Sequence, residues 1–129
     1  MKIISLKRGD FVVLSLEKKV EKVKSGLIIG LGALEWAKLK LYNLEKKEYS
    51  KKTVPGPLEV ASFTAIIAKS PEGKTTLHSH AVVTNASFEA FGGHLEEAEV
   101  SATFEAVIFE SSEEISRYHD DKIGLNLIK

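Results

Sequence analysis

Three of the four histidines lie in one stretch of the chain, and imidazole is the side chain that proteins use most often to bind metal ions. His78 and His80 are two residues apart, and His94 directly follows Gly92-Gly93. The residues around the first pair favour a β-strand, on which side chains two residues apart point to the same face. A hairpin between the two segments could bring His94 back beside the pair. Three imidazoles from neighbouring strands would form a zinc site with one open ligand position.

A second interpretation is that the three histidines lie on a solvent-exposed or subunit face and make ordinary hydrogen bonds. The chain has no cysteine, so disulfides, thiolate ligands and cysteine nucleophiles are excluded. Glu59 is the lone acid of an otherwise apolar predicted strand. It either faces solvent or faces the histidines, where it would orient a ligand or act as a general base.

The elements that must position these side chains are mostly strands. Residues 58–69 are typical of a long strand, and a tight turn at 70–74 leads into the strand of His78 and His80. Gly30 and Gly32 indicate a close backbone approach or a bulge. Most connections are too short for helical crossovers, so neighbouring strands should be antiparallel. Further strands are expected at residues 1–6, 27–31, 35–42 and 100–109 and in the C-terminal tail.

Two helices are expected beside these strands. The first follows Asp10, placed as an N-cap, and ends at Ser25-Gly26, because apolar residues between them recur every three or four positions. The second is short, beginning at the Ser-Ser-Glu-Glu sequence of 111–114 and running through Tyr118. The predicted fold class is α+β, with about seven strands in a mainly antiparallel sheet, one main N-terminal helix and a short C-terminal helix.

The composition is that of one soluble globular domain covering residues 1–129. No apolar run approaches the roughly 20 residues of a membrane span, and the N-terminus does not resemble a signal peptide, so a cytoplasmic location is expected. The formal net charge is zero, which argues mildly against a stand-alone DNA-binding domain. The candidate DNA contacts are Lys18, Lys19 and Lys22. Glutamates are interleaved with them, which is typical of a solvated helix face.

Five segments, in order along nearly the whole chain, resemble the plant and prokaryote conserved (PPC) domain. They are GLIIGLGAL (26–34), GPLEV (56–60), LHSHAVV (77–83), FGGHL (91–95) and Ile-Gly-Leu (123–125). The His-x-His pair followed by Gly-Gly-His-Leu at this spacing is more specific than either half alone. In plants this domain is part of AT-hook nuclear proteins, whereas in prokaryotes it stands alone.

The resemblance implies a seven-stranded antiparallel sheet with flanking helices, assembled as a homotrimer. It also implies the prokaryotic form, which keeps the histidines matched here by His78, His80 and His94 and in some members looks like a zinc binder. No Arg-Gly-Arg-Pro AT-hook occurs in the chain, and Pro57-Leu58 replace the Arg-Phe of the plant motif. The expected protein is therefore a zinc-binding homotrimer to which the sequence assigns no particular activity. The alternative is a DNA-binding or transcription-associated protein.

Overall fold

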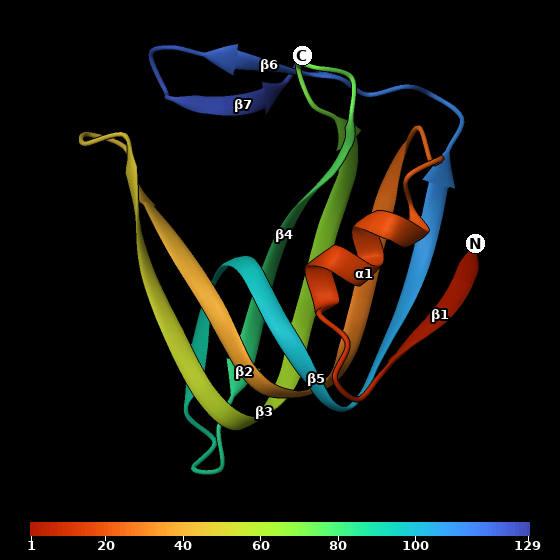
Figure 1. Ribbon diagram of the computed structural model, residues 1–129. Coiled ribbons are helices and arrows are strands. Elements are labelled where there is room, and N and C mark those ends of the chain that lie inside the picture. Colours follow the sequence, from red (N-terminus) through yellow and green to blue (C-terminus); the bar gives the residue numbers. More distant parts are fainter.

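Strands dominate the structure, a computed structural model that describes all residues from 1 to 129 (Figure 1). The predicted α+β class, with about seven mainly antiparallel strands and a main N-terminal helix, is confirmed. The strands form two sheets, a five-stranded one in the order β1-β5-β2-β3-β4 and a two-stranded one of β6 and β7. The elements are β1 (Lys2–Lys7), α1 (Val12–Lys19), β2 (Ser25–Asn43), β3 (Glu48–Lys69), β4 (Thr75–Thr84), β5 (Ala90–Ser111), β6 (Arg117–Asp120) and β7 (Leu125–Ile128).

The five-stranded sheet closes on itself at one end through β5. One edge of β5 pairs with β2 over residues 94–111. The other edge pairs with β4 at residues 90–94 and with β1 at residues 103–108. Between these two stretches β4 and β1 diverge, and α1 packs there, mainly on β5 and also on β4 (Figure 1). No helix in the structure has the length and apolar character that crossing a membrane requires.

The inward faces of the strands and one face of α1 form a single core of 23 buried residues. Two of its largest members, Phe63 and Phe104, are each 1% exposed and meet edge to face with ring centroids 5.2 Å apart. On β4 the buried side chains alternate with His78 and His80. Because successive strand side chains point to opposite faces, packing the core sends both imidazoles to the outer face.

Two of the predicted strands are parts of one long strand. Residues 27–31 and 35–42 both belong to β2, which changes its register with β3 between Gly30 and Gly32. A Cβ atom at Gly32 would collide with the carbonyl of Thr103 on β5. The expected close backbone approach is therefore confirmed, and it bends the strand without ending it.

The N-terminal helix is shorter than predicted and is capped differently. It ends at Lys19, because residues from Ser25 onward pair with β5 as part of β2. The prediction that Asp10 is the N-cap is wrong, since its carboxylate accepts the N–H of Lys7 instead. Two N–H groups of the first turn of α1 donate to the Glu97 carboxylate of β5, at 2.7 and 3.1 Å. A carboxylate from a distant strand thus compensates the positive end of the helix.

The predicted short C-terminal helix does not form. The chain after Ser111 makes a bend and enters β6. Ser111 Oγ accepts the N–H of Glu113, as in a capped turn. The backbone beyond it is engaged elsewhere, because the Lys69 N–H donates to the Ile115 carbonyl and Ser116 forms a bridge with Lys69. The Ser-Ser-Glu-Glu pattern therefore marks a turn that leads into a strand.

Candidate metal centre

His78, His80 and His94 come together where β4 and β5 pair. His80 lies directly opposite His94 in the register, and His78 precedes His80 by two residues on the same face of β4. One ligand nitrogen from each ring lies within 4.8 Å of the other two. The hairpin expected between the two segments is present, and it forms a cluster that could hold a metal ion.

Strand alternation and a close backbone approach position these rings. Ser79, between the first two histidines, is buried, and its Oγ donates to the Leu95 carbonyl at 3.2 Å. This bond ties β4 to β5. A Cβ atom at Gly93 would lie 2.9 Å from the Lys40 carbonyl oxygen, closer than side chains normally come. Glycine at this position therefore lets β5 reach β4 beside His94 while it still pairs with β2.

The spacing of the ring nitrogens suits a metal ion. Ligands about 2.0–2.1 Å from a tetrahedral zinc ion lie roughly 3.3 Å from one another. The Nε2 atoms of His78 and His80 are 3.1 Å apart. Without a metal, this contact needs one protonated Nε2 and one lone pair. A metal ion held by both Nε2 atoms would require their two lone pairs, so the proton of the donor ring would then sit on its Nδ1 atom.

Two of the three imidazoles are held in the neutral form. Burial lowers the pKa of His94 to about 4, and the nearby Lys40 ammonium adds to the effect. The pKa of His78 is also lowered, first by burial and then by the charges of His80 and Arg117. Only a neutral imidazole can bind a metal ion. The cluster therefore presents metal-binding nitrogens at neutral pH.

Acid should destabilise the metal-free fold through His94. The ordinary histidine pKa is 6.5 and the folded-state value is about 4, so the unfolded chain binds the proton first as the pH falls. The penalty is absent above about pH 6.5 and grows as the pH falls from about 6.5 to about 4. Urea denaturation should give a lower free energy of unfolding at about pH 5 than at about pH 7. His94→Gln should reduce the difference, and an unchanged pH dependence in that variant would contradict the assignment.

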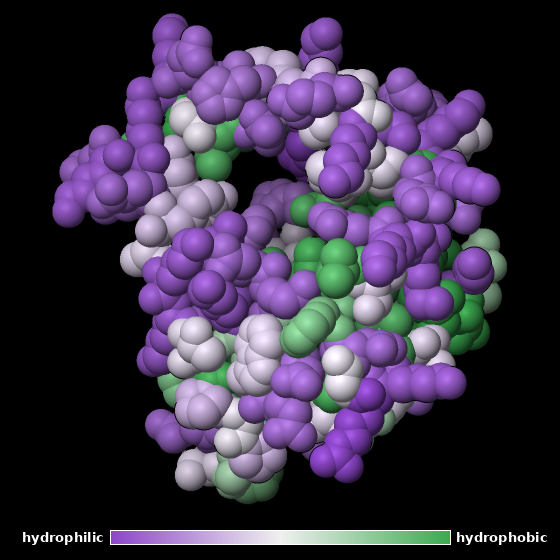
Figure 2. Space-filling model, in the orientation of Figure 1, coloured by the Kyte–Doolittle hydropathy of each residue, from purple (hydrophilic) through white to green (hydrophobic).

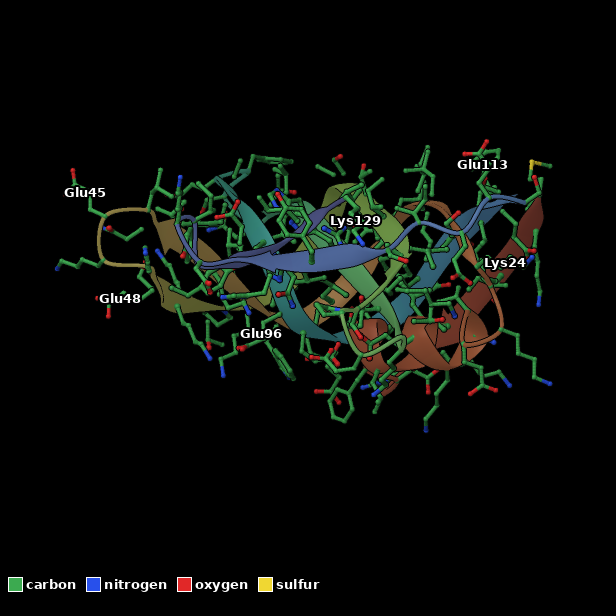
Figure 3. The ribbon with its side chains drawn as sticks, turned by 90° about the horizontal axis from the view of Figure 1, so that it is seen from above. Lys24, Glu45, Glu48, Glu96, Glu113 and Lys129 are labelled. Atoms are coloured by element: carbon green, nitrogen blue, oxygen red, sulfur yellow. The ribbon has the colours of Figure 1, made fainter.

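The β6–β7 hairpin arches over the histidines and covers a cavity of about 310 Å³. Just before the hairpin begins, the Lys69 N–H donates to the Ile115 carbonyl. At its tip the Tyr42 hydroxyl donates to the Ile123 carbonyl at 2.6 Å. Figure 3 shows the hairpin lying across the sheet from above, and Figure 2 shows the hollow beneath it. Residues that line the cavity include Tyr49, Leu77, His78, His94, Arg117 and Leu127.

The acid closest to the cluster in sequence is engaged by lysines. The Glu96 carboxylate lies 3.2 Å from Lys38 Nζ and 2.9 Å from Lys51 Nζ, and Lys40 Nζ lies 3.8 Å away. The hydrogen bond from Lys51 is the largest cause that lowers the pKa of Glu96 to about 2. This carboxylate is therefore ionised at neutral pH and forms ion pairs with the lysines.

The structure does not bring Glu59 to the histidines. Glu59 pairs with Thr84 on β4. Thr84 lies four residues beyond His80, which places it roughly 13 Å from His80 along the strand. Its side chain is exposed. Within one chain Glu59 faces solvent and does not contact the cluster.

The candidate DNA contacts also lie apart from the cluster. Lys18 and Lys19 form the last turn of α1, and Lys22 follows in the turn after it. All three are exposed, and none forms an ion pair. These three lysines form a surface that is separate from the histidine cluster.

Two side chains beside the cluster were not predicted from the sequence as site residues. Tyr49, on β3, packs on His94 with ring centroids 5.7 Å apart. Arg117 reaches the cavity from β6. No local motif identifies either residue. Strand pairing brings Tyr49 beside His94, and the β6–β7 hairpin brings Arg117 to the cavity.

The fold and the cluster together define a small antiparallel β domain with a three-histidine site between two strands. The family model of the Plants and Prokaryotes Conserved (PCC) domain matches residues 2–112. The chain belongs to this family, as its sequence resemblance indicated.

Several solved structures are similar to this chain. A protein from Bacteroides thetaiotaomicron, described as a suspected DNA-binding protein, is 30% identical with a TM-score of 0.94, over 98% of this chain and 90% of that one. A protein from Archaeoglobus fulgidus, described as metal-containing, is 32% identical with a TM-score of 0.89, over 99% and 91%. A plant- and prokaryote-conserved protein from Pyrococcus horikoshii is 25% identical with a TM-score of 0.90, over 99% and 90%. No curated protein sequence matches the chain.

Proposed function

We propose that this protein binds one zinc ion per chain through His78, His80 and His94. The observation that carries the proposal is a set of three ligand nitrogens within 4.8 Å of one another. The lowered pKa values of His78 and His94 support it, and so does the similar Archaeoglobus fulgidus protein described as metal-containing. Held by three imidazoles, zinc would keep an open ligand position and act there as a Lewis acid.

The chain partly encloses this position with a side chain and a hairpin. Tyr49 packs against His94, and the β6–β7 hairpin covers the cavity. No carboxylate lines the cavity of a single chain. A general base within reach of a substrate is the usual mark of hydrolytic catalysis, so the proposal is limited to metal and ligand binding.

Elemental analysis of protein purified without chelators tests the proposal. About one zinc ion per chain is expected, in keeping with one three-histidine site. A protein that carries no stoichiometric metal, even after incubation with zinc, would contradict it.

We also propose that the protein is a homotrimer that works in the cytoplasm. Support comes from exposed apolar side chains on the outer face of the large sheet. Ile3 and Ile29 both pair with Val107, so they are neighbours on this face, and Thr64 pairs with both Ile29 and His80. An exposed apolar surface of this kind is typical of an interface. The exposed apolar residues on it are Ile3, Ile29, Leu31 and Phe109.

Light scattering tests the assembly. The expected particle has three times the 14.2 kDa mass of the chain. A monomer at micromolar concentration would contradict the homotrimer, and cell fractionation tests the location.

DNA binding is the second candidate function. The observation that favours it is the likeness to proteins described as suspected DNA-binding proteins, at 30% and 29% identity. The exposed amino groups of Lys18, Lys19 and Lys22 would contact phosphates. Phosphate contacts release counterions, so binding of duplex DNA should weaken steeply between about 50 and about 200 mM salt. Fluorescence anisotropy that shows no binding at low salt would remove this candidate.

A further inference from the structure

The β6–β7 hairpin places a guanidinium beside the histidine cluster without an acidic partner. Arg117 and His78 line the same cavity. The side chain of Arg117 makes one hydrogen bond, from Nη1 to the Asn126 carbonyl at 3.2 Å. A guanidinium carries five N–H donors, so four of them have no protein acceptor. Arg117 forms no ion pair, and no carboxylate lines the cavity.

This positive charge is only partly exposed to water, which makes its isolation costly. Burial lowers the pKa of Arg117, and the charge of Arg117 in turn helps to lower the pKa of His78. Arg117 is partly buried, so its guanidinium has lost part of its hydration, and an acceptor in the cavity would offset that loss of free energy. A zinc ion at the cluster would add further positive charge. The missing counter-charge is best supplied by an anion in the cavity.

The size and lining of the cavity limit what that anion can be. Its volume of about 310 Å³ is at the lower end of small-molecule sites. Leu77, Leu125 and Leu127 give part of the wall an apolar character. A guanidinium fork matches the paired oxygens of a carboxylate or a phosphate. The cavity therefore suits a small molecule with an oxyanion at one end and a short apolar body.

We propose that this cavity binds a small organic oxyanion, and that Arg117 recognises its charged group. The inference rests on the proposed zinc site, which would lie next to the bound molecule. The charged group is a carboxylate or a phosphate, and the two share the oxygen acceptors that the fork requires.

Isothermal titration calorimetry of the zinc-loaded protein tests this inference, with 3-methylbutanoate and inorganic phosphate as the two probes in a low-salt buffer without chloride. At least one probe should bind the unsubstituted protein. Arg117→Gln should weaken that binding roughly tenfold or more, because a charge-assisted pair is lost. Arg117→Lys keeps the charge without the fork and should weaken it less. The probe that binds more tightly distinguishes a carboxylate from a phosphate.

Arg8→Gln is the matched control, since it removes the same charge from the other arginine. Arg8 lies near Trp36 and Glu99, away from the histidines. The anion affinity of the Arg8→Gln variant should stay within about twofold of that of the unsubstituted protein, because Arg8 lines a different pocket from the histidines and Arg117. If Arg117→Gln fails to fold in a thermal scan, Arg117→Lys carries the comparison.

Two results would overturn the inference. One is that neither probe binds the unsubstituted protein, and the other is that the Arg117 variants bind as tightly as it does. Zinc content measured on the same samples separates the two proposals. Absence of zinc from every sample overturns the metal site, whereas full zinc content with anion binding independent of Arg117 overturns only the role of Arg117.

Discussion

His94→Ala should lower the affinity for zinc on the order of a hundredfold. Structural zinc sites bind with about 10–16 kcal/mol shared among about four ligands, so losing one ligand costs roughly 3 kcal/mol. His94 is the only ligand of the cluster that β5 provides, and His78 and His80 cannot replace it from β4. A competition titration against a coloured zinc chelator measures the change directly.

His119→Ala is the control for this experiment. His119 lies on β6, is exposed and is not a member of the cluster, so its loss should leave zinc affinity unchanged. Equal losses in the two variants would show that histidines bind zinc without a defined site. Unchanged affinity in His94→Ala would remove His94 from the ligand set.

Phe63→Ala should have the largest effect on stability, lowering the free energy of unfolding by about 3–5 kcal/mol. Phe63 is 1% exposed, meets Phe104 edge to face, and pairs with Ala81 on β4. Removing its ring leaves a cavity in the core under the strand that carries His78 and His80. The loss is a large part of the total stability of about 5–15 kcal/mol that small domains have. Urea denaturation at neutral pH measures it.

Phe88→Ala removes the same ring from the surface. Phe88 is 90% exposed in the turn between β4 and β5, so the expected change is within about 0.5 kcal/mol. Comparable losses at the two positions would mean that Phe63 is not part of the packed core.

The histidine cluster was predictable because its geometry follows from a short-range rule. Side chains two residues apart share a face of a strand, and a hairpin between the two segments was expected to bring His94 back beside the pair. The register of β4 and β5, with His80 opposite His94, satisfies both expectations.

Contacts between distant segments explain what the sequence did not show. Glu97 caps α1 from 84 residues away, which no local pattern can reveal. Pro55 lies within β3 opposite Trp36, at a register shift that tolerates its missing N–H. Arg117 reaches the cavity from the C-terminal hairpin, which is bonded to Lys69 at its start and to the Tyr42 hydroxyl at its tip.

Anomalous diffraction at the zinc absorption edge, from crystals of protein purified without chelators, would show directly whether zinc binds at the histidine cluster. One strong peak per chain is expected, about 2.0–2.1 Å from one ring nitrogen of each of His78, His80 and His94. The absence of a peak there, or a zinc ion bound only by other residues, would contradict the proposed zinc site.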